Sequence, residues 1–303
     1  MSQQQTLNST KNRQGFQGWP SPDHTAPQRQ TSELSLEYAK RDGKTVLTHS
    51  RFSHPWYSFP PLYLDDTGCA TTFLTNPSGG FVGGDDLSLV ATLLEDTHVL
   101  FTTPSATKIY RTLEKPAAQS IDLTVGPNAI LEWVPELTIP FAGSHFDQTI
   151  NIGLDTGASL ILWDALAAGR VARGERWAFS HFSNQIKITL SDGKSLEERY
   201  ALDPTQGTLS LTFEQDWNYV GSLYIVSDKV PSSTWEQTKE ELETVIERHS
   251  RQVLGGVSET SLPGLVVKVV TRSAPELNTV LEELWSVVRM NLWGTPLPIL
   301  RRY

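Results

Sequence analysis

The chain has 303 residues, of which 38% are hydrophobic, so it can bury a sizeable core in one large β-rich domain or in two ordinary domains. Acidic residues outnumber basic residues by 34 to 25, which gives a formal charge of -9 and leaves no basic stripe to follow a phosphate backbone. The sequence therefore predicts a globular protein with no nucleic-acid partner.

The chain contains one cysteine, Cys69, which excludes an intrachain disulfide framework. We expect this residue to be a small buried hydrophobic side chain. No apolar run approaches the roughly 18 residues of a membrane span, and the N-terminal segment lacks the apolar stretch of a secretion signal. The sequence predicts a cytoplasmic protein with no membrane association.

Residues 1–31 are rich in Gln, Ser, Thr, Asn and Pro and poor in apolar residues. Such a segment cannot bury enough apolar surface to offset the entropy that is lost on ordering. We therefore expect a disordered polar tail at 1–31 and a single folded domain at 32–303.

Strand patterns fill the chain from Glu33 to Ser227. Short segments rich in Val, Ile, Leu, Thr and aromatic residues are separated by turn sequences such as DDTG, GPN, DTG and SDG. The clearest strands cover 33–39, 87–94, 119–125, 184–190 and 222–227. No helical spacing competes over this span, so a mainly β fold is expected.

Two helices are predicted near the C-terminus. In the first, Ser233 and Glu236 form the pattern of a capping box and Gly255 terminates the helix, whose apolar stripe comprises Trp235, Leu242, Val245, Ile246, His249 and Val253. After a short strand at 264–272, the second helix begins at Ser273 and ends before Gly294. Its stripe comprises Leu277, Val280, Leu281, Leu284, Val288 and Leu292.

A glycine-rich stretch, NPSGGFVGGDDLSLV, runs from Asn76 to Val90. A phosphate-binding loop needs a helix directly after its glycines, whereas Asp85, Asp86 and a strand follow here. The two aspartates are adjacent on that strand, so their side chains point to opposite faces and cannot chelate one ion together. We interpret the stretch as a bend that needs glycine.

Local metal-binding and nucleophile motifs are absent from the sequence. There is no HExxH, HxH, CxxC or GxSxG. His49 and His54 are an odd number of residues apart in a strand-like segment, and the other histidines are isolated: His24, His98, His145, His181 and His249. We expect each to be an ordinary surface or core residue, and no catalytic residue is predicted.

Three acidic residues lie near apolar or arginine neighbours: Glu132, Asp164 and Glu175. Paired carboxylates would suit a β-rich carbohydrate-active enzyme, whose acid and base are two such groups. The alternative is ordinary ion pairing, for example of Glu175 with Arg173 or Arg176. The sequence leaves both interpretations open.

Six segments in order give the chain a family resemblance. They read NPSGGFVGGDDL, LFTTPSATKIYRT, AILEWVPELTIPFAGS, ILWDALAAGRVARGE, SNQIKI and LWSVVRMNLWGTPLPILRRY. Over Asn76 to Tyr303 the chain resembles the urease accessory protein D family, also called UreH. The resemblance implies a β-helix-like stack of sheets with two α-helices near the C-terminus and a non-enzymatic scaffold in urease maturation.

The resemblance also implies partners and cargo. The partners are the urease apoenzyme, accessory protein F and the accessory GTPase G. The cargo is nickel(II), which is expected to pass through an internal water-filled channel. No tightly bound cofactor is expected. By motif matching, Asp85, Glu175 and Asp164 are the candidate residues of the nickel route. We further expect the second helix and the segment after Gly294 to contribute to docking accessory protein F, and residues such as Trp285 and Trp293 to belong to exposed apolar surface there.

Overall fold

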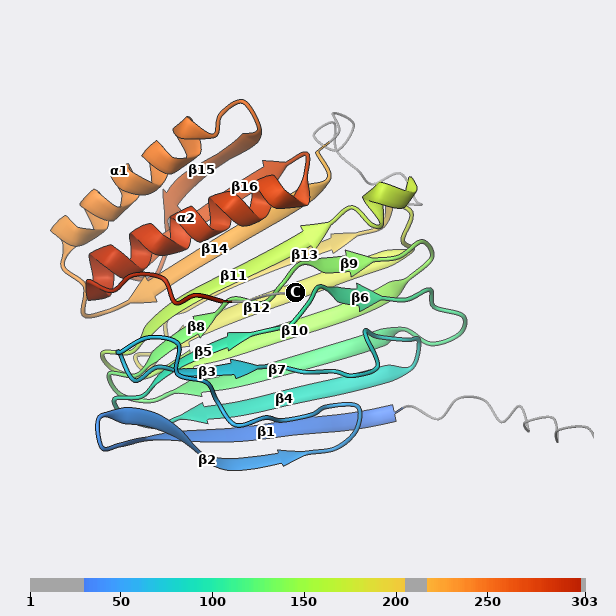
Figure 1. The fold of residues 1–303 in the computed structure, drawn as a ribbon. Helices are drawn as coiled ribbons and strands as arrows, with labels where there is room; N and C mark the ends of the chain where they lie inside the picture. Colours follow the sequence, from blue (N-terminus) through green and yellow to red (C-terminus); the bar gives the residue numbers. More distant parts are fainter. Residues whose placement is uncertain (1–29, 205–216, 301–303) are drawn as a thin grey trace, which may run out of the picture.

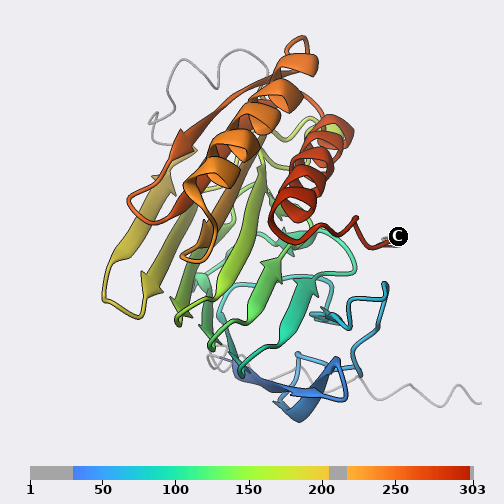
Figure 2. The same ribbon diagram turned by 90° about the vertical axis from the view of Figure 1, so that its left-hand side faces the viewer.

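The computed structural model describes residues 30–204 and 217–300. Within these residues the chain forms three layers: a seven-stranded sheet, a nine-stranded sheet, and two helices that cover part of the outer face of the second sheet (Figures 1 and 2). This arrangement confirms the expected stack of sheets with two helices near the C-terminus.

The seven-stranded sheet contains, in spatial order, β13 (Ser195–Leu202), β12 (His181–Leu190), β10 (His145–Leu154), β7 (Ala117–Val125), β4 (Asp85–Leu93), β1 (Gln30–Arg41) and β2 (Lys44–Phe52). The nine-stranded sheet contains β15 (Val253–Glu259), β16 (Gly264–Thr271), β14 (Tyr219–Ser227), β11 (Ser159–Ala167), β8 (Ile130–Trp133), β5 (His98–Thr102) and β3 (Ala70–Phe73), with β6 (Thr107–Ile109) and β9 (Thr138–Pro140) beside β11.

Between β3 and β12 the chain passes back and forth between the two sheets, so it winds as a solenoid. The pairs β4 and β5, β7 and β8, and β10 and β11 each form part of one coil, and neighbouring coils pair in parallel. Each coil turns through a left-handed residue, namely Asp96, Asn128 and Gly157. Asp and Asn tolerate this conformation and Gly adopts it freely, which explains the turn sequences that separate the predicted strands.

Two apolar cores hold the layers together, and β11 contributes to both. Leu160 and Leu162 pack between the sheets, whereas Ile161 and Trp163 face the helices. A strand buried on both faces carries a nearly continuous apolar run, which explains the sequence LILWDALA.

The second predicted helix is confirmed. Helix α2 (Ala274–Trp293) begins after Ser273, whose hydroxyl accepts a hydrogen bond from the Glu276 amide, and ends at Gly294 with φ of 64°. No helix in the described part of the chain is long and apolar enough to cross a lipid bilayer.

The boundaries of the first predicted helix were wrong at both ends. Helix α1 (Ser232–Arg248) follows Pro231 and has no side-chain cap, so Ser233 is its second residue and not its cap, and the segment from Val253 onward is strand β15. The reason is tertiary pairing: Gly255 lies so close to β16 that a Cβ atom would be 2.4 Å from the Lys268 carbonyl oxygen. The glycine that was interpreted as a helix terminator is a strand residue in close contact.

Strand β1 begins at Gln30, two residues before the expected start of the folded domain at residue 32, because residues 30 and 31 pair with β4. The predicted tail otherwise lies outside the described residues.

The glycine-rich stretch forms a bend, as expected. Gly79, Gly80 and Gly84 have positive φ values, and the stretch leads into β4 rather than into a helix. A Cβ atom on Gly80 would lie 2.2 Å from the Lys108 carbonyl oxygen. The glycines therefore allow the loop to turn and to pack against the neighbouring chain.

Candidate functional site

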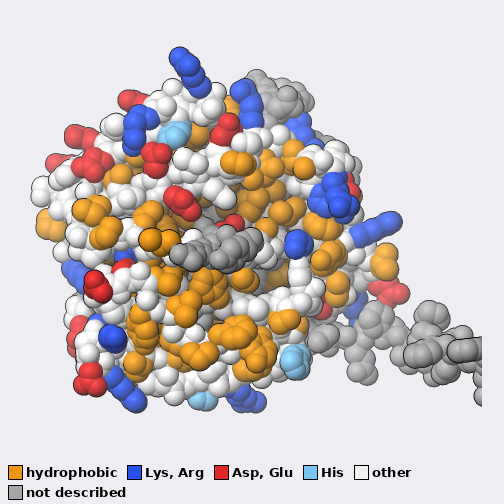
Figure 3. Space-filling view, viewed as in Figure 1, with side chains coloured by type: hydrophobic (Ala, Val, Ile, Leu, Met, Phe, Trp, Pro, Cys, Tyr) orange, Lys and Arg blue, Asp and Glu red, His pale blue; other side chains and the backbone are white. Residues whose placement is uncertain are grey.

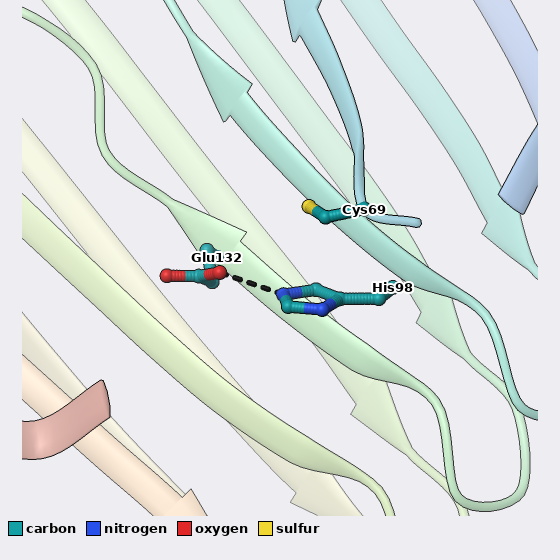
Figure 4. Close-up of side chains that lie close together, drawn as sticks. All are labelled: Cys69, His98 and Glu132. Atoms are coloured by element: carbon teal, nitrogen blue, oxygen red, sulfur yellow. Dashed lines mark hydrogen bonds and ion pairs between the residues drawn. The ribbon is translucent and has the colours of Figure 1, made fainter. Parts of the chain in front are cut away.

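Three potential metal ligands meet between the nine-stranded sheet and α2: Cys69, His98 and Glu132 (Figure 4). Their ligand atoms all lie within 4.8 Å of one another, and all three residues are buried. His98 and Glu132 stand on the adjacent strands β5 and β8, with His98 Nε2 2.6 Å from Glu132 Oε1. Cys69 immediately precedes β3. The expectation that Cys69 is buried is confirmed.

Helix α2 closes this cluster with two further side chains. Trp285 Nε1 donates to Glu132 Oε2 at 2.6 Å, and Arg289 Nη1 lies 3.0 Å from Glu132 Oε1. Arg289 Nη2 also donates to Asp65 Oδ2 at 3.0 Å. Trp285 is 1% exposed, so the expectation that it forms exposed apolar surface was wrong. Its indole nitrogen is satisfied inside the protein.

The chemistry of this cluster favours a structural role, in which it joins α2 to the sheet, over metal binding. The Glu132 carboxylate already accepts hydrogen bonds from His98, Trp285 and Arg289. Burial and the nearby carboxylates raise the pKa of the Cys69 thiol well above its usual value, which disfavours the thiolate that metals bind. A divalent cation would also lie close to the Arg289 guanidinium. We infer that the network joins α2 to the sheet.

A second group of potential ligands lies on the solvent face of the seven-stranded sheet: His145, Asp147 and His181. The buried cluster had no local sequence signal, because its members come from different coils. In the second group, His145 and Asp147 are two residues apart on β10 and share a face, and the parallel register adds His181 by placing it opposite His145.

Asp85, the first predicted route residue, closes the glycine-rich loop. Its carboxylate accepts a hydrogen bond from the Val82 amide at 2.9 Å, and the side chain is almost fully buried. Burial raises the pKa of Asp85, and the hydrogen bond opposes that shift in part. These contacts support a loop-closing role.

Asp164, the third route candidate, lies between the sheets on β11. Its Oδ2 accepts hydrogen bonds from Asn184 Nδ2 at 2.9 Å and from the Tyr200 hydroxyl at 2.8 Å, both on strands of the opposite sheet. It also lines a partly open cavity of about 90 Å³, whose lining combines polar residues such as Gln119 and Gln148 with apolar residues such as Ile121 and Trp133. A cavity of this size has room for water beside its polar groups.

The pKa of Asp164 gives a pH prediction. Burial raises this pKa, so the native state keeps a proton that the unfolded chain has already lost. This proton contributes its full stabilisation of the native state below pH 3.8, the ordinary pKa of an aspartate. The contribution is lost as the pH rises through the raised pKa of the native state. In urea titrations across this range, Asp164→Asn should therefore gain stability relative to the unmodified chain as the pH rises.

The control for this pH prediction is Asp192→Asn, because Asp192 is exposed and its pKa is lowered by Lys194. This variant should show no such gain. A stability difference between Asp164→Asn and the unmodified chain that is independent of pH would contradict the prediction.

Glu175, the second route candidate, lies in a hollow on the surface. It forms an ion pair with Arg170 and accepts a hydrogen bond from the Ala142 amide at 3.3 Å. The hydrogen-bonded Arg170 lowers the pKa of Glu175. Its bonded partner is thus Arg170, not Arg173 or Arg176, because the chain turns back through the short helix η1 (Val171–Arg173).

The three acids considered for paired-carboxylate catalysis occupy three environments. Glu132 faces α2, Asp164 faces the space between the sheets, and Glu175 lies in the surface hollow. Each is held by its own partners, and no contact described in the structure joins any two of them. The geometry therefore gives no support to the interpretation of the chain as a carbohydrate-active enzyme with paired carboxylates.

Fold and sites together define a two-sheet β-solenoid protein with a helical cover and a polar cavity between its sheets. The sequence pattern of the UreD urease accessory protein family matches residues 30–302. The chain belongs to this family.

Curated relatives agree over nearly their whole length. A urease accessory protein UreD of Klebsiella pneumoniae subsp. pneumoniae is 31% identical over 273 residues, which cover 89% of this chain and 93% of the relative. One from Pseudomonas savastanoi pv. phaseolicola is 31% identical, with 87% and 91% covered. One from Lachnoclostridium phytofermentans is 27% identical, with 89% and 97% covered.

Proposed function

We propose that the chain acts as a scaffold in urease maturation, binds apo-urease together with accessory proteins F and G, and helps to deliver nickel to the urease active site. The observation that carries this proposal is the family match over residues 30–302. The relatives are accessory proteins by name, which favours a role without catalysis of its own. The cytoplasmic location stays a prediction of the sequence.

The polar cavity between the sheets supports the nickel-delivery part of the proposal. Its lining offers side-chain oxygens of Gln119, Gln148 and Asp164. Oxygen donors separated by water lower the cost of moving a divalent cation through protein without trapping it. Of the three predicted route residues, Asp164 is the one that lines this cavity. Asp85 and Glu175 enter the proposal through the family-like motifs that they end.

The surface supports the docking part. Hydrophobic side chains gather on the face that carries α2 and the C-terminal segment (Figure 3). The segment between β2 and β3 also lies on this side (Figures 1 and 2), and it exposes Phe59 and Leu62 by about half, while Ile299 after α2 is 77% exposed. Apolar surface of this extent is typical of a partner interface, here that of accessory protein F.

The proposal is tested by urease coexpressed with accessory proteins F and G, with and without this chain. We expect nickel per urease active site and urease activity to fall to background when the chain is omitted. With Asp164→Asn, the complex should still assemble while nickel loading falls several-fold. Asp85→Asn and Glu175→Gln test the other two route residues in the same assay.

The outcomes separate the parts of the proposal. Full urease loading without the chain would contradict the maturation role. Full loading with Asp164→Asn in an intact complex would remove Asp164 from the route. Loss of copurifying F after deletion of residues 294–303 would support the docking surface, and unchanged copurification would exclude that segment.

A further inference from the structure

We propose that His145, Asp147 and His181 form a binding site for a divalent transition-metal ion on the solvent face of the seven-stranded sheet. The site is separate from the cavity between the sheets, because these residues alternate along β10 and β12 with the buried core residues Phe146 and Phe182.

The spacing of the ligand atoms suits one ion. His181 Nε2 lies 3.3 Å from Asp147 Oδ1, and His145 Nε2 lies 3.6 Å from Asp147 Oδ2. Metal–ligand bonds of about 2.1 Å place neighbouring ligand atoms roughly 3.0–3.4 Å apart in octahedral or tetrahedral geometry. An ion could therefore be bound with small rotations of these side chains.

The neighbouring groups already orient two of the three ligands. His181 Nδ1 lies 2.6 Å from Asp203 Oδ1. Because a carboxylate only accepts hydrogen bonds, Asp203 holds the proton on Nδ1, and a metal would replace the proton on Nε2, the nitrogen that faces Asp147. A carboxylate behind a metal-binding histidine is the usual outer partner of such sites. The Ser183 hydroxyl likewise donates to Asp147 Oδ1.

The backbone around the site is also fixed. The amides of Ser180 and His181 both donate to the Ser144 carbonyl, at 2.8 and 3.1 Å, which ties the starts of β10 and β12 together. The His145 amide donates to the Thr112 hydroxyl at 2.9 Å. The imidazole rings lie 4.6 Å apart between centroids and are partly exposed, so an ion can enter from solvent.

The ligand set indicates the class of ion. Two imidazoles and one carboxylate, with further positions open to water, suit Ni²⁺, Zn²⁺, Co²⁺ or Cu²⁺ rather than Mg²⁺ or Ca²⁺. Metal binding as such follows from the geometry. The choice of nickel as the physiological ion rests on the proposed function.

The test is calorimetric titration of the purified full chain with NiCl₂, followed by Co²⁺ absorption spectroscopy. We expect one site that is lost in the double variant His145→Gln, His181→Gln, and a Kd about tenfold higher in Asp203→Asn, which removes only the orienting carboxylate. The Co²⁺ spectrum should lack the charge-transfer band of a thiolate ligand. Circular dichroism and thermal melts check that each variant is folded.

Two matched controls locate the site. His249→Gln removes a histidine that contacts one carboxylate, that of Glu283, without a third ligand, and Cys69→Ser alters the buried cluster. Both should bind Ni²⁺ like the unmodified chain. Unchanged binding in the double variant, or loss of binding in Cys69→Ser, would overturn the proposal. Normal urease loading by the double variant would leave the metal site standing and detach it from nickel delivery.

Discussion

Replacing Arg289 by methionine should lower the free energy of unfolding by about 3–5 kcal/mol, the usual cost of removing one partner of a buried ion pair. Arg289 and Glu132 are both fully buried, and the guanidinium also contacts Asp65. Without the Arg289 guanidinium, the buried carboxylate of Glu132 loses its cationic partner. Urea unfolding followed by tryptophan fluorescence measures this change.

Two further variants make the Arg289 test specific. Combining Arg289→Met with Glu132→Gln removes both charges and should restore much of the lost stability. Arg248→Met is the matched control, because Arg248 on α1 is 60% exposed and pairs with Glu283 at the surface. That pair should contribute less than about 1 kcal/mol. Equal losses from Arg289→Met and Arg248→Met would show that the buried network does not fasten α2.

Replacing Gly80 by alanine should lower the free energy of unfolding by about 2–5 kcal/mol, from overpacking and unfavourable backbone conformation together. The added Cβ atom would lie 2.2 Å from the Lys108 carbonyl oxygen, which accepts a hydrogen bond from the Phe81 amide. A backbone atom cannot move aside as a side chain can. Thermal and urea unfolding measure the loss.

Gly84→Ala is the control for this prediction. Gly84 also has a positive φ, of 93°, but no atom lies within 4 Å of the position of its Cβ. Replacing Gly84 by alanine should therefore lower the free energy of unfolding only through the unfavourable backbone conformation, by about 1–2 kcal/mol. If Gly80→Ala were no more destabilising than Gly84→Ala, close packing would not be the reason for glycine at residue 80.

The sequence predicted those elements whose signals are local. The β-rich span and α2 follow from alternation and from caps such as Ser273 and Gly294, which interact with their immediate neighbours in the chain. The glycine-rich stretch was predicted to be a bend because a strand, and not a helix, follows it in the sequence. The end of helix α1 was predicted too late because Gly255 pairs with β16, a contact that local sequence does not record.

The solenoid has no regular sequence period for a related reason. Leu93, Val125, Leu154 and Leu190 pair side by side, yet they are separated by 32, 29 and 36 residues. The coils vary in the loops outside the sheets, while only the paired segments keep register. Repetition in space therefore leaves little repetition in sequence.

By itself the sequence determined the class of fold, the presence of two late helices and, through six collinear motifs, the family. The tertiary structure decided which polar side chains meet. Register across the coils placed His145 opposite His181, and the packing of α2 brought Arg289 to Glu132, two residues separated by 157 positions in the chain. Such contacts depend on strand register and helix docking, which are fixed by the whole core rather than by the residues that make the contact.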